Sequence, residues 1–244
     1  MHWFSAADPF APLNWYNAIG AAGCVLWMVA YYFIIVQGFR DKAYGMPMLA
    51  LALNITWEFT AFVFCERPVA LWAWIEGIWL GIDLVILWQF IRYGRHEALP
   101  KGLGHLFYPL TIITLAGCFI FHYTWLKFWD DKLLFVNAFI INLVMSVLFI
   151  QLWWKRHPSD KGLSLKAAWC KLGGTALTSI QCGIFLPHAM GTPAFRESWA
   201  FTWFLYVAIF IADCVYVYLL YHGRKLTASA TTSAAPTPSP APSA

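Results

Sequence analysis

Charged residues are scarce in this chain of 244 residues, because Asp, Glu, Lys and Arg together make up only 11% of it. A water-soluble domain usually carries about 25% charged residues, so the shortage excludes an ordinary soluble globular protein. Hydrophobic residues account for 61% of the sequence, which places it in the membrane class. Fifteen Trp, twenty Phe and eleven Tyr exceed the needs of interfacial aromatic belts, and the surplus is available to line a cavity.

Several functional motifs are also missing. The six cysteines include no CxxC pair and mostly lie in apolar segments, so we interpret them as small buried hydrophobic residues, not as disulfides or metal ligands. A clustered basic face, which a nucleic-acid partner would need, is absent. The first fourteen residues lack a basic n-region, which argues against a cleavable signal peptide.

Apolar runs of about 18 residues or more indicate helices that cross a bilayer. Such runs lie at residues 15–37, 46–64, 70–93, 105–124, 133–153, 167–188 and 199–221. The sixth run is rich in Gly, Thr and Ser and must pack closely on its neighbours. The sequence therefore predicts an all-α polytopic membrane protein, with a seven-transmembrane-helix bundle over residues 1–226. Residues 227–244 contain only Ser, Thr, Ala and Pro and are predicted to form a disordered tail.

Positive residues predict the orientation of the bundle. Of the sixteen Lys and Arg, only Arg67, Lys127, Lys132 and Arg196 fall on one side. We assign the other twelve, Lys171 included, to the first, third and fifth connections and the C-terminal tail. Positively charged loops favour the cytoplasm, so we expect an N-terminus outside or in the lumen and a cytoplasmic C-terminus. The membrane would be the endoplasmic reticulum of a eukaryote or the plasma membrane of a bacterium.

Four acidic residues lie within the apolar runs: Glu58, Glu76, Asp83 and Asp213. A charged side chain near the bilayer centre costs about 2.5–3.5 kcal/mol, so such residues usually face the bundle interior and carry function. Low dielectric disfavours the ionised form, so a buried carboxyl group tends to keep its proton and can act as a general acid. We predict that the acids line one cavity in the middle and outer half of the membrane.

Aromatic and amide side chains share helix faces with these acids. Asn54 lies four residues before Glu58, with Phe62 four residues after it, so the amide can orient the carboxyl group. Two further stripes combine acid and aromatic side chains. The third run carries Trp72, Glu76, Trp79 and Asp83, and the seventh carries Tyr206, Phe210 and Asp213, continued by Tyr216 or Val217. An aromatic face stabilises a cation by about 0.5–2 kcal/mol, so this lining suits protonation of an epoxide or alkene and guidance of the carbocation. The competing interpretation is that the acids only hold helices together by hydrogen bonds.

Other classes of membrane protein fit less well. A retinal protein would need a Lys in the seventh run, and a haem bundle would need His pairs at membrane depth. A metal-dependent prenyl transferase would need Asp-rich motifs, whereas Asp130-Asp131 is a lone pair in a short loop. A proton-coupled membrane carrier stays open because intramembrane carboxylates also form proton relays, although no repeated halves are visible.

Two motifs carry a family resemblance. The run Tyr44-Gly45-Met46-Pro47 is followed by Asn54-Ile55-Thr56-Trp57-Glu58, and the last apolar run carries Asp213 followed by Tyr216. The combination resembles the small integral-membrane terpene cyclases of fungal meroterpenoid and indole-diterpenoid pathways, which also have bacterial relatives. The resemblance covers residues 15–222.

The resemblance implies an enzyme of the isomerase or lyase type with Glu58 and Asp213 as its essential acids. One of them would protonate a terminal epoxide or alkene on a prenyl chain, and the resemblance does not decide which. The substrate would be a farnesyl or geranylgeranyl group attached to an aromatic, polyketide or indole core, with no metal or other cofactor. A prenyltransferase and an epoxidase would be pathway partners. The residues expected to orient the substrate or stabilise the cation are Asn54, Trp57, Phe62, Glu76, Trp79, Asp83, Phe210 and Tyr216. A membrane epoxide hydrolase, which would add water, is a third hypothesis.

Overall fold

The computed structural model describes residues 15–65, 70–185 and 199–233, which form helices and connecting turns without any strand. A 3₁₀ turn, η1 (Gly104–Leu106), precedes α4, and a π-helical turn, η2 (Gln181–Phe185), extends α6. Each predicted run overlaps one α-helix, so the predicted all-α class is confirmed for these residues. The α-helices are α1 (Trp15–Asp41), α2 (Met48–Phe64), α3 (Ala70–Gly94), α4 (Phe107–Phe128), α5 (Phe135–Arg156), α6 (Leu165–Ile180) and α9 (Trp199–Ser233).

Five helical segments are long and apolar enough to cross a bilayer, which supports an integral membrane protein. Helix α2 is apolar but has 17 residues, and α6 has 16. At 1.5 Å per residue such helices cover about 24–26 Å of a hydrocarbon core that is about 30 Å thick. The described residues thus provide five candidate spans where the sequence predicted seven. These spans are Ala18–Asp41, Trp72–Gly94, Gly104–Phe128, Phe135–Arg156 and Ala200–Gly223.

The C-terminal boundary differs from the one expected. Helix α9 continues to Ser233, past Leu226, where the predicted tail begins. The remainder of that tail, residues 234–244, lies outside the described residues, as do Arg67 and Arg196, which entered the charge count.

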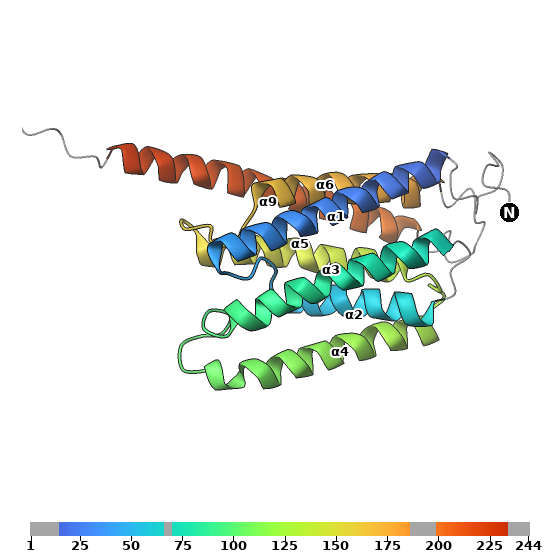
Figure 1. The fold of residues 1–244 in the computed structure, drawn as a ribbon. Helices are drawn as coiled ribbons and strands as arrows, with labels where there is room; N and C mark the ends of the chain where they lie inside the picture. The colour runs from blue at the N-terminus through green and yellow to red at the C-terminus, as the bar shows by residue number, and fades with distance from the viewer. Residues whose placement is uncertain (1–14, 66–69, 186–198, 234–244) are drawn as a thin grey trace, which may run out of the picture.

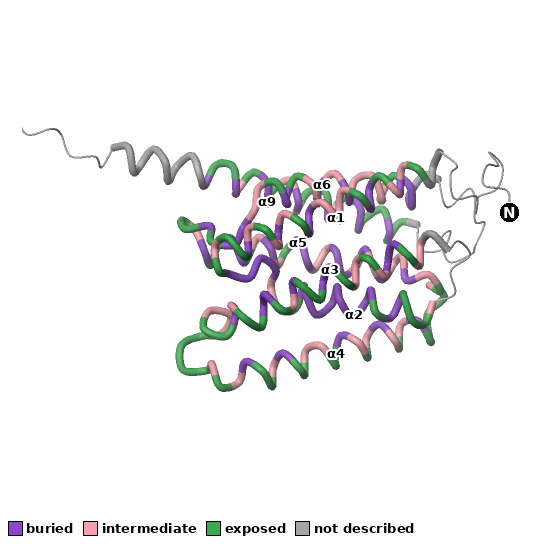
Figure 2. The backbone as a smooth tube through the Cα atoms, in the orientation of Figure 1, coloured by how far each residue is buried: buried purple, intermediate pink, exposed green. Residues whose placement is uncertain are grey.

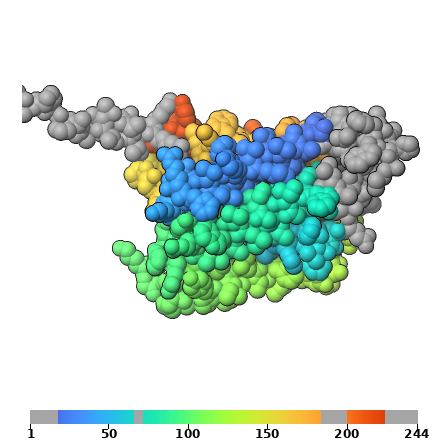
Figure 3. Space-filling view, in the orientation of Figure 1, coloured from blue at the N-terminus to red at the C-terminus, as the bar shows by residue number. Residues whose placement is uncertain are grey.

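Helix α2 lies at the centre of the bundle, in contact with α3, α4 and α5. Helices α1, α6 and α9 lie along one side, where α1 contacts α6 and α9 contacts α5 and α6 (Figure 1). Figure 2 shows α2 buried along most of its length, whereas α4, at the opposite edge, exposes much of its surface. The exposed side chains of α4 include Ile112 and Ile113, as expected for a helix that faces lipid. Figure 3 shows α1, α3 and α4 on one face of the molecule.

Helices α1 and α6 approach closely because both carry glycine at their contact. A Cβ atom added to Gly23 would lie 2.9 Å from the carbonyl oxygen of Gly174, and one added to Gly174 would lie 2.9 Å from that of Gly23. Small residues allow such backbone contact between membrane helices. The close packing expected of the Gly-rich sixth run is therefore present.

Arg156, at the C-terminal end of α5, joins the connecting segments at one end of the bundle. Its Nη1 donates to the carbonyl oxygens of Tyr44, at 2.6 Å, and Lys161, at 2.8 Å. Its Nε donates to Glu97 Oε1 at 3.0 Å, and its guanidinium lies 4.1 Å from the centre of the Tyr44 ring. Tyr44 of the YGMP run is thus held by Arg156, which lies 112 positions later in the sequence.

We expect Arg156→Lys to lower the free energy of unfolding by about 2–3 kcal/mol, because an ammonium group cannot reproduce the fork of donors or the stacking on Tyr44. The measurement is the thermal unfolding of the detergent-solubilised protein. The exposed Arg95→Lys serves as the control and should change stability by less than about 0.5 kcal/mol. Equal unfolding temperatures for the two variants would contradict this role of Arg156.

Candidate active site

Asn54 and Glu58 lie one helical turn apart on α2, where they meet Tyr31 of α1 and Asp83 of α3. Asn54 Nδ2 is 3.0 Å from Glu58 Oε1, 2.8 Å from Asp83 Oδ2 and 2.6 Å from Tyr31 Oη. Tyr31 Oη also lies 3.5 Å from Glu58 Oε1. All of these side chains are buried. The hydrogen bond expected between Asn54 and Glu58 is present, and Asn54 additionally holds Asp83.

This cluster retains at least one carboxylic proton. Two ionised carboxylates around one amide would repel each other strongly in a dry interior, and the Asn54 amide offers only two N–H groups. One oxygen of each acid, Glu58 Oε2 and Asp83 Oδ1, is buried and has no hydrogen-bond partner among the described residues. Of these two acids, Glu58 is a residue of a cavity wall and Asp83 is not.

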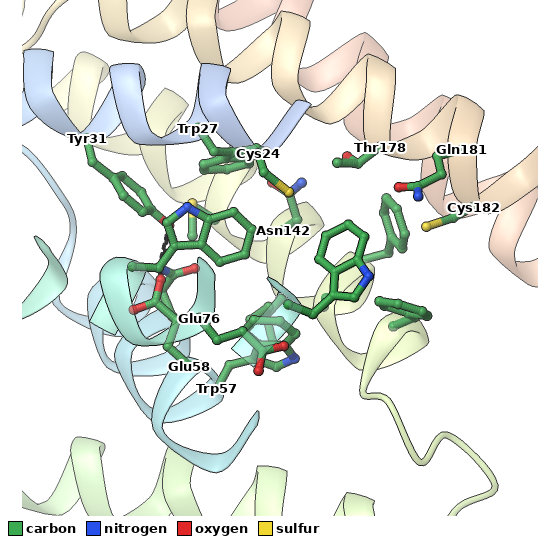
Figure 4. A pocket seen from close by; sticks show the side chains of 18 residues that line it. Cys24, Trp27, Tyr31, Trp57, Glu58, Glu76, Asn142, Thr178, Gln181 and Cys182 are labelled. Atoms are coloured by element: carbon green, nitrogen blue, oxygen red, sulfur yellow. Dashed lines mark hydrogen bonds between the residues drawn. The ribbon is translucent and has the colours of Figure 1, made fainter. Parts of the chain in front are cut away.

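A cavity lies between α1, α2, α3, α5 and the end of α6 with η2 (Figure 4). The space open to the centre of a water molecule is about 130 Å³. In Figure 4, Glu58 lies on one side of the cavity and Gln181 and Cys182 on the other, with Asn142 between them. Aromatic walls of this kind suit an apolar, unsaturated ligand and stabilise positive charge. The aromatic residues at the wall are Trp27, Tyr31, Trp57, Trp72, Trp79, Phe135 and Phe139.

The structure brings part of the predicted site together at this cavity. Asn54, Trp57, Glu58, Glu76 and Trp79 all line it. The predicted stripe of α3 therefore faces the cavity with its first three residues. Its last residue, Asp83, is not part of the wall and accepts a hydrogen bond from Asn54. Glu76 is the second carboxyl group at the wall, and its side chain is buried.

Phe62 and Phe210 do not belong to the cavity wall. They are 47% and 50% exposed, respectively, so they face outward. The buried side of α9 instead carries Tyr206, Ile209 and Asp213. The expectation for these two phenylalanines is corrected for a physical reason: lipid tails are as apolar as a protein core, so both sides of a membrane helix attract the same residues.

Asp213 lies away from this cavity, in a buried ion pair. Its Oδ1 and Oδ2 accept hydrogen bonds from Lys171 Nζ of α6 at 2.6 and 2.8 Å. Lys171 Nζ also donates to Ser146 Oγ at 2.7 Å and lies 5.3 Å from the centre of the Trp27 ring. The exposed fractions of the Lys171 and Asp213 side chains are 5% and 2%. The assignment of Lys171 to the positive loops is therefore corrected, and a Lys inside an apolar run was the signal for it.

The single cavity predicted for all four acids is likewise corrected, because Asp213 forms a separate group. Tyr216 belongs to that group. Its ring centre is 5.4 Å from that of Phe149, and with Lys171 it borders a smaller cavity. Tyr216 thus contacts the surroundings of the ion pair and not the larger cavity.

Hydrogen bonds join the ion pair to the larger cavity through α5. Ser146 Oγ, which accepts from Lys171, donates to the carbonyl oxygen of Asn142 at 2.9 Å. Asn142 Nδ2 donates to Thr175 Oγ1 at 3.2 Å, one turn after Lys171 on α6. Asn142 itself lines the cavity, as Tyr31 does. Sequence reasoning missed both residues, although an amide within an apolar run was a usable signal.

We expect Asn54→Leu to reduce product formation about 10–100-fold, since it removes the donor to Glu58 and Asp83, and hydrogen bonds to charged groups contribute about 1.5–3 kcal/mol. The measurement compares initial rates in membranes that contain equal amounts of each variant. Thr56→Val is the matched control, because Thr56 donates within α2 to the Ala52 carbonyl oxygen and lies outside the cavity wall. Equal activity of Asn54→Leu and the control would contradict an orienting role.

Within the described ranges, no three His, Cys, Asp or Glu side chains gather closely enough to ligate one metal ion. The site consists of a buried carboxyl group at the wall of an aromatic cavity inside a bundle of apolar helices. These features define a membrane protein suited to acid chemistry on an apolar ligand. The chain belongs to the Pyr4-like transmembrane terpene cyclases, whose family model matches residues 5–226.

Fungal proteins are among its relatives. Terpene cyclase spyD of Aspergillus fumigatus is 28% identical over 113 residues, which cover 46% of this chain and 48% of the relative. Terpene cyclase andB of Emericella variicolor is 30% identical over 139 residues, covering 54% and 56%. Asnovolin H synthase nvfL of Aspergillus novofumigatus is 25% identical over 218 residues, with 86% of each chain covered. The chain spans about half the length of spyD and andB.

Proposed function

We propose that this protein is a membrane terpene cyclase and that Glu58 starts the reaction by protonating a prenyl chain. The observation that carries the proposal is the placement of Glu58. Asn54 and Tyr31 hold one carboxyl oxygen, while the other has no partner among the described residues and belongs to a side chain at the wall of an aromatic cavity. The names of the relatives support the reaction class.

The proposed substrate is a farnesyl or geranylgeranyl chain attached to an aromatic, polyketide or indole core. Glu58 transfers its proton to a terminal epoxide oxygen, the C–O bond breaks, and a hydroxyl group and a tertiary carbocation form. Alkenes of the chain attack the cation in turn, each forming a C–C bond. An alkene protonated at carbon would start the same cascade. Loss of a proton from the last cation regenerates an acid, so the product has the mass of the substrate and the enzyme is an isomerase.

The cavity walls support this cascade in two ways. Trp57 and Trp79 present aromatic faces that stabilise the moving positive charge. The walls are mostly apolar, which limits early capture of the cation by water. We propose that Glu76, the second carboxyl group at the wall, receives as a carboxylate the proton that is lost at the end, and that this proton returns to Glu58 before the next turnover.

Asp213 is not the donor in this proposal. It forms a buried ion pair with Lys171, from which it accepts two hydrogen bonds, and it does not border the larger cavity. We therefore assign the proton donor to Glu58 and propose that Asp213 acts through its neighbours.

For the whole protein we propose seven spans, with α2 and α6 crossing the bilayer beside their longer neighbours. The C-terminal ends of α1, α3 and α5 lie at one end of the bundle (Figure 1). Most of the positive residues belong to the last turns of these helices, to the segments that follow them and to the C-terminal part of the chain. We place that end in the cytoplasm and the N-terminus outside or in the lumen. In a eukaryotic cell the membrane would be the endoplasmic reticulum, with a prenyltransferase and an epoxidase supplying the substrate.

The test uses wild-type protein in detergent, without any ion gradient. Prenylated phenols and indoles, with and without a terminal epoxide, are offered in turn, and the products are analysed by mass spectrometry. A product of unchanged mass and altered retention time establishes a cyclase. A product heavier by one water indicates an epoxide hydrolase. If none of these substrates is converted and the protein instead supports proton-dependent flux across vesicle membranes, the protein is a proton-coupled carrier and not a cyclase.

A further inference from the structure

Asn142, a residue of the cavity wall, carries a polar atom that no group among the described residues satisfies. Asn142 Oδ1 is buried and has no hydrogen-bond partner among the described residues, and the side chain is 9% exposed. Asn142 Nδ2 is already used by Thr175 Oγ1. A buried acceptor without a donor costs about 1–3 kcal/mol, so an atom of this kind at a cavity wall suits a ligand that brings the donor.

The position of Asn142 complements that of Glu58. Figure 4 shows Asn142 between the Glu58 side of the cavity and the side formed by Gln181 and Cys182. A substrate whose prenyl terminus meets Glu58 would extend its polar core past Asn142. A hydroxyl or N–H group on that core would supply the missing donor.

The Lys171–Asp213 ion pair is connected to Asn142 through Ser146. Lys171 donates to Ser146 Oγ, which donates to the Asn142 carbonyl oxygen. Lys171 also lies one turn before Thr175, which accepts from the Asn142 side chain. The ion pair is thus linked to the Asn142 backbone through Ser146, and its Lys171 shares α6 with the partner of the Asn142 amide, although Asp213 is absent from the cavity wall.

We propose that Asn142 recognises the substrate by accepting a hydrogen bond from a hydroxyl or N–H group on its core, and that Lys171 and Asp213 are positioning residues for Asn142. The identity of the ligand rests on the proposed cyclase function, whereas the recognition itself is measurable without turnover.

The experiment measures equilibrium binding of tritiated farnesyl hydroquinone to the full-length protein in detergent, with unlabelled farnesyl hydroquinone or its dimethyl ether as competitor. We expect wild type to bind the hydroquinone about tenfold more tightly than the ether, which cannot donate. Asn142→Ala and Asn142→Leu should lose this preference, with the affinity for the ether unchanged. Retained binding of the ether shows that the cavity of a variant is folded. One folded Asn142 variant is sufficient for the test. Thr60→Val is the control, because Thr60 donates within α2 and lies outside the wall.

Further variants separate this inference from the proposed function. The double variant Lys171→Met with Asp213→Leu, which removes both charges together, should weaken hydroquinone binding while leaving ether binding intact, as a positioning role requires. Glu58→Gln should keep the full preference for the hydroquinone over the ether even though turnover is lost. The binding result therefore tests the role of Asn142 separately from the proposed cyclase activity. The inference is overturned if wild type shows no preference for the hydroquinone, whether both probes bind or neither does. It is also overturned if both Asn142 variants retain the preference.

Discussion

Replacing Glu58 by Gln is expected to reduce cyclisation about 10³-fold, within the range of about 10²–10⁴ that general acid catalysis contributes. The amide keeps the size of the side chain and can keep the contact with Asn54, but it has no carboxylic proton to give. Because the binding contacts remain, the loss should appear in kcat, with KM nearly unchanged. The measurement is the rate of product formation at several substrate concentrations in membranes that contain matched amounts of protein.

Glu76→Gln is the matched control for this prediction, since both residues are buried glutamates at the same wall. We expect the Glu76 variant to keep the initiation step and to change the ratio of products. The reason is that another group must then accept the proton that the last cation loses. If the Glu58 variant retained wild-type rates while the Glu76 variant lost them, the roles would be reversed. A similar loss in both would show that the two acids act as a unit.

The sequence predicted the features that depend on local periodicity. Apolar runs marked every helix of the described chain, and the spacing of four residues placed Asn54 and Glu58 in contact. The stripe of α3 was predicted equally well, because residues spaced by three and four lie on one side of a helix. Within one helix, relative positions follow from geometry alone, and the polar residues show which side is buried.

The failures concern relations between helices. The sequence gives no angle between α9 and the rest of the bundle, so Phe210 was placed inward by its proximity to Asp213, although Ile209 occupies the buried side. The partner of Asp213 lies 42 positions away, on a helix that was interpreted only as weak and Gly-rich. Because a Lys near a helix end also fits a cytoplasmic charge, its position could not identify it as half of an ion pair.

Removing Lys171 is expected to have the largest effect on folding. Lys171→Met would leave the Asp213 carboxylate buried without a partner, and breaking a buried pair from one side costs about 3–5 kcal/mol. We expect little monodisperse protein after detergent extraction and a strongly lowered unfolding temperature. Lys161→Met, which removes a positive charge outside the helices, is the control and should behave as wild type. Normal yield and stability of the Lys171 variant would contradict the ion pair.

The double variant Lys171→Met with Asp213→Leu separates folding from chemistry, because apolar residues of similar size can replace a buried ion pair without loss of stability. We expect this variant to regain most of the yield and unfolding temperature that Lys171→Met alone loses. Without Lys171 the Ser146 hydroxyl loses its donor, so substrate affinity should be lower than in wild type while product still forms at saturating substrate. A raised KM with a largely preserved kcat is thus the expected result for a positioning role. A folded double variant that binds substrate and never turns it over would instead show that the ion pair takes part in the chemistry, with Asp213 as the candidate proton donor.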